Sequence, residues 1–467
     1  MPGVLYLVHG LPPEEYTGTP IVAHGYATGM IGRGWRTAVA YASPALLRDV
    51  PKGGSASDAD ADGDVARFPL PPSQSNGLIW ATESAGRPDE DRASATDAFR
   101  AAMEQFEPDL VHVVDNVSLP LALPEVAADG GIPVVRTVSC AEDLCGLIVP
   151  VSPCSDPVGY CDAPISPGHC ARCVAAVFDD RWGQPAGSEP GAGPEPQGTV
   201  RFVSSRALTS SLLEHRQARL LRGLESKRSR AERQFRDVFD VVVFSTPAWR
   251  EYFEKTLPLG PDKARVISMG MDSAGFPTDR RRRRREDGSP LVLAWATTVD
   301  PARGADDVVE AFTDVRLATR PDYRLQVHGG GDHRLLDRLV GANPNVEIAG
   351  RYEAPALPAL LAEADVGLSA SLFETFHRVT REYLLAGLPV VANPTFGIRD
   401  LIRHGENGLL YEHARSGSLA DAVVTLLDDP ELEARLAEGA RSTPVRTADE
   451  ELDELAALYD EVLRRRG

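Results

Sequence analysis

Short, continuously apolar segments alternate with segments of helical spacing twice along the chain, and this alternation limits the fold more than any other feature. The first series starts at VLYLVHG (Val4 to Gly10), and the second at PLVLAWAT (Pro290 to Thr297). Apolar runs of this length are typical of strands that are buried on both faces of a parallel sheet. Repeated strand–helix–strand units build such sheets. The sequence therefore predicts an α/β protein with two Rossmann-like domains that face a cleft.

Domain boundaries follow from where the two series begin and end, and from segments that break the alternation. Ligands are expected at the carboxyl ends of the strands in both sheets. The first domain is predicted over residues 1–275, with insertions at 51–97 and 140–200. A linker over 276–289, which contains six consecutive arginines, leads to a second domain over 290–445. A helix over 446–467 is predicted to cross back to the first domain.

Composition excludes several classes of function. The net charge of −19 argues against a general nucleic-acid binder, because affinity for phosphates comes from clustered Lys and Arg. No segment contains the roughly 18 apolar residues of a membrane span. The N-terminus has neither a basic region nor a cleavage site, so it reads as a first strand and the protein is predicted to be cytoplasmic.

Two acidic residues stand eight positions apart ahead of an apolar strand, at Glu374 and Glu382. A helix turns about 100° per residue, so this spacing brings the second side chain back to within about 80° of the first. Ionised carboxylates only accept hydrogen bonds and therefore suit ligands that carry hydroxyls. Taken alone, the spacing is common by chance and fits an exposed helix equally well.

The surrounding residues resemble one enzyme family. The stretch SLFETFHRVTREYLLAGLPVVANPTFGIRDLIRHGENGLLY (Ser371 to Tyr411) resembles the signature of the family 4 glycosyltransferases. The segments PPEEYTGTP, PDLVHVVDN, DPARGADDVVEAF and LPALLAEADVGLSAS match other parts of that family, in the same order. The resemblance implies the GT-B fold, with the acceptor in the first domain and the donor in the second.

The resemblance also implies the reaction. Such enzymes move a sugar, here of the hexosyltransferase type, from a nucleotide-diphosphate donor to an acceptor with retention of anomeric configuration. The acceptor is unknown, and glycan, glycolipid or natural-product biosynthesis would suit it. The alternatives are a non-catalytic, glycosyltransferase-like accessory subunit and a GT-B sugar-nucleotide epimerase or hydrolase.

Roles of individual residues carry over by position. Glu374, the candidate catalytic residue, would contact hydroxyls of the donor sugar, and Glu382 would hold the ribose diol. Arg303 stands where the family usually has a diphosphate-binding Lys, although an ordinary surface charge is the alternative. Gly18 would let the first loop approach the diphosphate, because it has no Cβ.

Backbone N–H groups of Thr375, Phe376 and His377 are expected at a helix N-terminus, where they could bind phosphate. Four positions depart from the family. His377 and Arg378 replace residues that are often Gly and Leu, and their side chains would either donate to phosphate or pack. Thr297 stands where many members have an Arg, and Ser139 stands where the family often has a His. The last two departures are what raise the accessory-subunit alternative.

Cysteines gather after the first-domain strands, in CSDPVGYCDAPISPGHCARC. The CARC pair suits a tight metal-binding turn, and the working hypothesis is a structural zinc on Cys154, Cys161, Cys170 and Cys173. Cys145 is an alternative fourth ligand. An iron–sulfur cluster and buried cysteines that bind no metal are the other interpretations.

The segment from Arg201 to Arg236 contains ten Lys or Arg against three Glu and has helical spacing of leucines. One interpretation is a packed helix with a solvated basic face. The other is a surface for an anionic acceptor or for peripheral contact with the inner face of a membrane.

Overall fold

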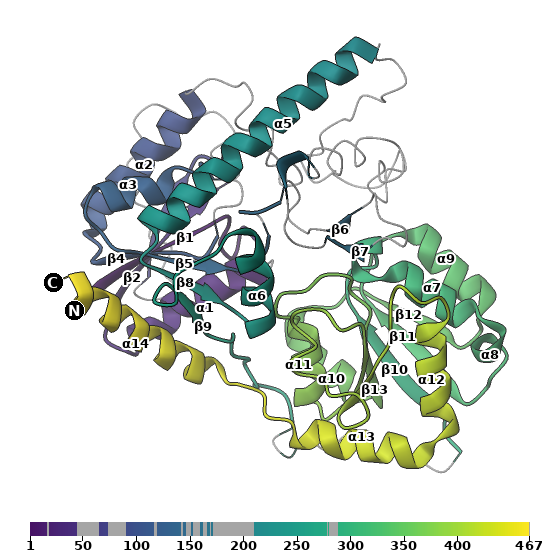
Figure 1. Ribbon diagram of the computed structural model, residues 1–467. Coiled ribbons are helices and arrows are strands. Elements are labelled where there is room, and N and C mark those ends of the chain that lie inside the picture. The colour runs from purple at the N-terminus through teal and green to yellow at the C-terminus, as the bar shows by residue number, and fades with distance from the viewer. Residues whose placement is uncertain are drawn as a thin grey trace.

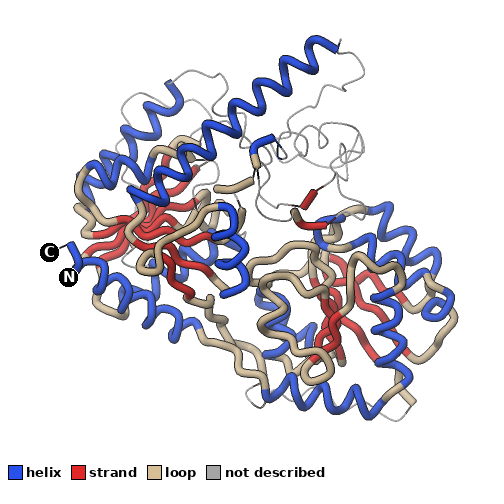
Figure 2. Tube along the Cα trace, in the orientation of Figure 1, coloured by secondary structure: helices blue, strands red, loops and turns tan. Residues whose placement is uncertain are grey.

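Two parallel sheets, each with helices on both faces, make up the two domains of the computed structural model (Figures 1 and 2). This confirms the predicted α/β class. The structure describes residues 1–15, 18–43, 65–72, 90–115, 119–141, 143–145, 151–152, 159–161, 166–168, 170, 210–277, 279 and 288–466.

The first sheet has seven strands in the order β3-β2-β1-β4-β5-β8-β9, and all of its pairings are parallel. Strand β1 pairs with both β2 and β4, so the strand order reverses there, where ligands of open α/β sheets bind. The strands are β1 (Gly3–Val8), β2 (Arg36–Ala42), β3 (Ala66–Leu70), β4 (Leu110–Val113), β5 (Val134–Val138), β8 (Val241–Phe244) and β9 (Ala264–Val266).

Helices cover this sheet on both faces. Helix α1 shares one core with the C-terminal helix α14, and the other helices cover the opposite face. Helix α5 extends well beyond the sheet (Figure 1). These elements are α1 (Gly18–Ile31), α2 (Glu90–Phe106), α3 (Leu123–Asp129), α5 (Ser210–Arg233), the π-helix η4 (Gln234–Val238), α6 (Pro247–Thr256) and α14 (Ala448–Arg466), with a short antiparallel pair β6 (Val151–Ser152) and β7 (Gly159–Tyr160).

The second sheet has six parallel strands in the order β12-β11-β10-β13-β14-β15. Its strand order reverses between β10 and β13. The strands are β10 (Leu291–Ala296), β11 (Tyr323–His328), β12 (Val346–Gly350), β13 (Val366–Ser369), β14 (Val390–Ala392) and β15 (Gly408–Leu410). The helices are η5 (Pro301–Arg303), α7 (Ala305–Thr313), α8 (Val315–Ala318), α9 (His333–Ala342), η6 (Ala354–Ala356), α10 (Leu357–Leu361), α11 (Arg378–Leu385), α12 (Ser418–Asp428) and α13 (Pro430–Ser442).

One part of the predicted insertion at 51–97 belongs to the sheet. Residues 66–70 form β3, which pairs in parallel with β2 at the edge, and α2 begins at residue 90. The short ARFPL segment contains a proline, which is tolerated only at an edge because it cannot donate to the ladder. Its flanks are rich in Asp, Ser and Gly, and this composition hid the strand in the sequence.

Two chain segments connect the domains and run side by side. The N–H of Met271 donates to the carbonyl of Arg446 (2.8 Å), and the N–H of Ala448 donates to that of Met271 (3.2 Å). A Cβ on Gly270 would stand 2.1 Å from the carbonyl oxygen of Thr447, so only glycine fits this close approach. Helix α14 starts here and packs against α1 of the first domain (Figure 1).

Glu451, in the first turn of α14, is buried beside these connections and accepts hydrogen bonds from the N–H of Gly270 (2.7 Å) and the hydroxyl of Tyr26 (2.5 Å). Burial raises the pKa of Glu451 to about 7, from an ordinary value of 4.5. The folded protein therefore holds this proton to higher pH than the unfolded chain does. Its contribution to the free energy of unfolding is full below about pH 4.5 and is lost as the pH rises through about 7.

We expect Glu451→Gln to remove this pH dependence, because the amide stays neutral while its oxygen still accepts from Gly270. Between pH 5 and pH 8 the unaltered protein should lose up to about 3 kcal/mol of unfolding free energy relative to the variant. Urea unfolding of both proteins at pH 5, 6, 7 and 8 measures the difference. Parallel curves of stability against pH would contradict the assignment.

Candidate functional site

The loop between β13 and α11, residues 370–377, carries the first of the two glutamates and is held in place by neighbouring loops. Asn393 donates through its side chain to the carbonyl of Ser371 (2.9 Å), and the N–H of Gly397 donates to the carbonyl of Glu374 (2.8 Å). Both donors follow β14, the neighbouring strand. The loop therefore lies at the carboxyl edge of the second sheet, beside the point where the strand order reverses.

Arg303 reaches this loop because of the residues around it. The carboxylate of Asp300 accepts the N–H of Arg303 (3.1 Å) and caps the short helix η5. Gly304 follows with φ of 73°, and a Cβ there would stand 1.9 Å from the carbonyl oxygen of Ala370. Glycine is therefore required on both counts. The DPARG sequence thus presses the end of η5 against the loop that carries Glu374.

Each of the two predicted glutamates forms an ion pair with an arginine. The guanidinium of Arg303 contacts the carboxylate of Glu374, with 40% and 17% of the side chains exposed. Nε of Arg378 donates to Oε1 of Glu382 at 3.0 Å. Burial raises the pKa of Glu382, and the nearby Arg378 opposes that rise. Each carboxylate proposed for hydroxyl binding is thus held by a cation from the same site.

Glu382 lies on a face of the sheet with two residues that sequence reasoning missed. Tyr352 follows β12, and burial together with the charge of Glu382 raises its pKa to about 12. His328 ends β11, is 3% exposed and lies with its ring centroid 6.5 Å from that of Tyr352. The signal that could have found them is their position, since both stand at carboxyl ends of predicted strands.

The three residues expected at a helix N-terminus lie just before it. Helix α11 begins at Arg378, with His377 as its N-cap. Thr375 serves the contact between domains: its hydroxyl donates to the carbonyl of Ser139 (2.6 Å), and its own carbonyl accepts from the hydroxyl of Ser245 (2.9 Å). Phe376 is buried, with the guanidinium of Arg381 3.6 Å from its ring centroid.

Aromatic side chains seal the same contact. Trp249 and Tyr252 on α6 of the first domain pack against Phe373 and Phe396 of the second, with ring centroids 4.7–5.7 Å apart. Phe373 directly precedes Glu374. The candidate donor loop is therefore attached to the first domain at the ends of β5 and β8, which places Glu374 beside the contact between the domains.

Gly18 and Thr297 are less closely tied to this group. Gly18 is the exposed first residue of α1, and a Cβ there would meet nothing within 4 Å, so local packing does not require glycine. Thr297 follows β10, and its N–H donates to the carbonyl of His328 (2.9 Å). Thr297 thus belongs to the same carboxyl edge as Arg303, without a cation to offer.

A charged cluster that the sequence did not indicate lies at the carboxyl edge of the first sheet. His9, after β1, contacts Asp115, after β4, through Nδ1 (2.7 Å) and Glu15 through Nε2 (3.2 Å). Burial alone would lower the pKa of His9, but the two carboxylates raise it to about 10. The protonated ring therefore faces the region predicted to hold the acceptor.

Two of the four predicted zinc ligands, Cys154 and Cys173, lie outside the described residues. Cys161 and Cys170 are buried in the larger core of the first domain, as is Cys145. Across the described ranges, no group of three or more His, Cys, Asp or Glu could hold a metal ion. The zinc hypothesis therefore stays a prediction.

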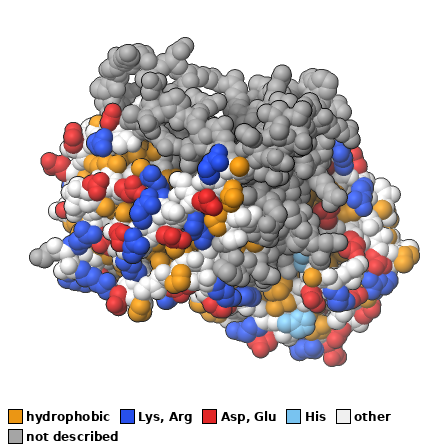
Figure 3. All heavy atoms as spheres, turned by 45° about the horizontal axis from the view of Figure 1, so that its top comes forward, with side chains coloured by type: hydrophobic (Ala, Val, Ile, Leu, Met, Phe, Trp, Pro, Cys, Tyr) orange, Lys and Arg blue, Asp and Glu red, His pale blue; other side chains and the backbone are white. Residues whose placement is uncertain are grey.

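Residues 201–209 of the basic segment lie outside the described residues, and 210–233 form α5. Near its C-terminal end, Lys227 donates to the carbonyl of Cys145 (2.8 Å), and Arg228 donates to that of Leu144 (2.7 Å). These two cations therefore bind the protein itself. On the face shown in Figure 3, Lys and Arg side chains are interspersed with Asp and Glu. Among the described helices, none is long and apolar enough to cross a membrane.

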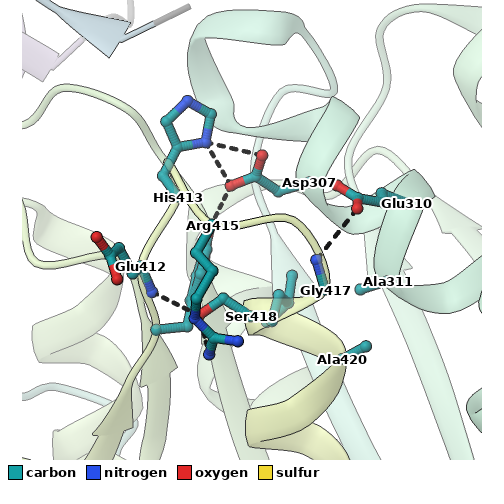
Figure 4. A pocket seen from close by; sticks show the side chains of 11 residues that line it. Asp307, Glu310, Ala311, Glu412, His413, Arg415, Gly417, Ser418 and Ala420 are labelled. Atoms are coloured by element: carbon teal, nitrogen blue, oxygen red, sulfur yellow. Dashed lines mark hydrogen bonds and ion pairs between the residues drawn. The ribbon is translucent and has the colours of Figure 1, made fainter. Parts of the chain in front are cut away.

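A small polar pocket lies between α7 and the segment after β15 (Figure 4). Asp307 accepts from the hydroxyl of Tyr411 (2.9 Å) and contacts Nδ1 of His413 (2.8 Å), and Glu310 accepts the N–H of Gly417 (3.1 Å). These groups bind one another, and none of the predicted site residues lines the pocket. Their hydrogen bonds stabilise the contact between α7 and this segment.

Comparison with known proteins identifies the second domain. Residues 289–429 match the family described as glycosyl transferases group 1. Among curated proteins, a D-inositol 3-phosphate glycosyltransferase from Acidothermus cellulolyticus is 32% identical over 225 residues, which is 44% of this chain and 50% of that protein. An alpha-D-kanosaminyltransferase from Streptomyces kanamyceticus is 29% identical over 197 residues, or 41% of this chain and 50% of that protein. The chain spans about half the length of these relatives.

Solved structures share the whole architecture. A sucrose-phosphate synthase from Thermosynechococcus elongatus superposes with a TM-score of 0.62 at 15% identity and covers 100% of both chains. HepE from Anabaena in complex with UDP-glucose gives 0.59 at 16% identity, over 98% of this chain and 99% of that one. At such identities the likeness shows the fold alone. It shows that the chain has the GT-B fold, and the family match shows that residues 289–429 are similar to the group 1 glycosyltransferases.

Proposed function

We propose that this chain is a retaining glycosyltransferase that moves a sugar from a nucleotide-diphosphate donor to an acceptor held by the first domain. The observation that carries the proposal is the meeting of Arg303, Glu374, Glu382 and the N-terminus of α11 at one carboxyl edge, beside the contact with the first domain. Cations and N–H donors suit a diphosphate, and carboxylates suit sugar hydroxyls. This site brings both kinds of group together from η5, the loop before α11 and α11 itself.

On this proposal the two ion pairs exchange partners when the donor binds. Arg303 turns to the diphosphate, Glu374 accepts hydroxyls of the donor sugar, and Glu382 accepts the ribose diol. Retention needs no side-chain nucleophile here, because the leaving phosphate can take the proton of the acceptor on the face that is attacked. Catalysis then rests on positioning and on stabilising the departing diphosphate.

On this proposal the acceptor and the donor bind to different domains. The first domain, proposed over residues 1–275, presents protonated His9 between Asp115 and Glu15 at its carboxyl edge. The second, proposed over 290–445, carries the donor site. On this proposal the choice of acceptor rests on the first domain.

Release of nucleoside diphosphate tests the proposal. The protein is incubated with UDP-, ADP- and GDP-linked hexoses, with and without candidate polyol acceptors, and nucleoside diphosphate is measured. Glu374→Gln serves as the matched control, since it keeps the shape but lowers the acceptor strength of the side chain. Absence of binding to every donor by calorimetry would favour the accessory-subunit alternative. Conversion of the sugar without release of nucleoside diphosphate would favour an epimerase.

A structural zinc on Cys154, Cys161, Cys170 and Cys173 is a separate proposal. We expect about one equivalent of zinc in the purified protein by elemental analysis, with loss of thermal stability on chelation, since a structural metal contributes directly to folding. Iron in place of zinc would favour a cluster. Less than half an equivalent of either metal would contradict the site.

A further inference from the structure

His377 combines an unusual backbone conformation with a buried polar side chain at the centre of the candidate site. Its φ is 58°, and Glu107 is the other non-glycine residue with positive φ in the described part of the chain. Histidine adopts this left-handed conformation more often than most residues but rarely. The side chain is 9% exposed. Strained backbone of this kind persists where the surroundings hold it, and functional sites are where it gathers.

The two ring nitrogens of His377 face different partners. Nδ1 contacts the hydroxyl of Thr380, and that hydroxyl lies 2.8 Å from the hydroxyl of Ser369 at the end of β13. Nε2 lies 3.5 Å from the hydroxyl of Ser371 and 3.8 Å from Oε1 of Glu374. The ring therefore joins a buried pair of hydroxyls to the carboxylate that is proposed to bind the donor sugar.

The partners also decide where the proton of the ring lies. Burial, with the nearby cations Arg303 and Arg381, lowers the pKa of His377 to about 3, so the ring is neutral and carries one N–H. An ionised carboxylate only accepts hydrogen bonds, so the N–H is favoured on Nε2, toward Glu374. Nδ1 is then the acceptor for the hydroxyl of Thr380, which in turn accepts from Ser369. Every group in this order has a suitable partner.

We propose that His377 is a positioning residue that holds Glu374 for the donor sugar once Arg303 has turned to the diphosphate. This inference rests on the proposed function. In the present structure Arg303 occupies the carboxylate, and Nε2 of His377 stands just beyond hydrogen-bond distance behind it. When Arg303 leaves, the imidazole N–H remains as a donor beside the carboxylate. Because it is neutral, it does not compete with Arg303 for phosphate.

The test measures the contribution of the sugar to binding affinity separately from that of the nucleotide. Calorimetry measures the affinity for UDP-glucose and for UDP, or for the corresponding ADP or GDP pair if that pair binds the unaltered protein. The ratio within a pair reports the contribution of the sugar. His377→Gly removes the ring and also relieves the backbone, since glycine adopts positive φ freely. We expect this variant to lose about tenfold in affinity for the nucleotide sugar and less than about threefold for the nucleoside diphosphate.

Conservative variants test the roles of the two nitrogens. His377→Gln places an amide nitrogen near the position of Nε2 and should recover part of the loss. His377→Asn reaches only the position of Nδ1 and should recover little, although asparagine tolerates the backbone better. Thr380→Val should reduce the sugar contribution in the same direction. Glu107→Gly is the matched control, because it relieves the other left-handed residue, far from the site in the first domain, and should change neither affinity.

Each outcome has a consequence. An equal loss for both ligands in His377→Gly would overturn the inference and assign His377 to the start of α11 alone. No loss for either ligand would overturn it as well. If His377→Gly unfolds at a lower temperature, the comparison of His377→Gln with His377→Asn decides instead. Both variants keep a side chain at the left-handed position and differ in which ring nitrogen they replace. If the unaltered protein binds no pair at all, the proposed function fails, and this inference fails with it.

Discussion

Replacing Glu382 with alanine is expected to weaken binding of nucleoside diphosphates by about 10- to 100-fold. The carboxylate is 12% exposed on α11, and on the proposed function its two oxygens accept the two hydroxyls of the ribose. Hydrogen bonds to a charged group contribute about 1.5–3 kcal/mol each, and part of that gain is offset because Arg378 must first release the carboxylate. Calorimetry with UDP, or with whichever nucleoside diphosphate binds best, measures the loss.

A ligand that lacks one hydroxyl sharpens this experiment. With the 2′-deoxy nucleotide, the difference between the unaltered protein and Glu382→Ala should shrink, because one partner of the carboxylate is already missing. Alanine at exposed Glu363 of the same domain is the matched control and should leave both affinities unchanged. An equal loss for the ribose and deoxyribose ligands would show that Glu382 acts on something other than the diol.

Much of the fold could be predicted because buried parallel strands leave a strong local signal. The apolar runs that begin at Val4 and Pro290 became β1 and β10, which each pair with a strand on both sides. The signal failed at β3 and at the three-residue strand β15, which are short and lie at sheet edges. Edge strands pair on one side only and need fewer apolar residues. Their amino-acid composition is therefore hard to distinguish from that of loops.

The candidate site, too, could be predicted from the sequence only in part. Glu374, Glu382 and Arg303 could be proposed because short motifs hold them, and Gly304 shows why the DPARG motif needs its glycine. Their partners could not all be proposed. His9 meets Asp115 across 106 residues of sequence, and nothing near either residue indicates the pairing.

Ion pairing within the site was also hidden, although its members are close in sequence. Whether Arg378 pairs with Glu382 or turns to a ligand depends on rotamers and burial, which a sequence does not encode locally. The αL conformation of His377 is a similar case: the family that the sequence resembles often has Gly at this position, but a histidine does not by itself indicate a positive φ.

Replacing Trp249 with alanine is expected to cost about 3–5 kcal/mol in the free energy of unfolding, the usual range for a fully buried tryptophan. Its ring packs against Tyr252 and Phe253 within the first domain, and against Phe373 and Phe396 of the second. The change would also leave the carbonyl of Val138 without the indole N–H that now donates to it at 2.8 Å. Both losses fall at the contact between the domains.

Because a two-domain chain need not unfold in one step, urea unfolding should be followed by far-ultraviolet circular dichroism and by tryptophan fluorescence together. Trp249→Phe is the control: it keeps an aromatic ring but not the N–H, and should lose about half as much. Phe373 adjoins Glu374, so the alanine variant should also weaken donor binding in the fully folded protein, whereas Trp249→Phe should not. A loss of stability below about 1 kcal/mol would contradict the packing. Unchanged donor binding in a destabilised alanine variant would mean that the contact stabilises the chain without shaping the donor loop.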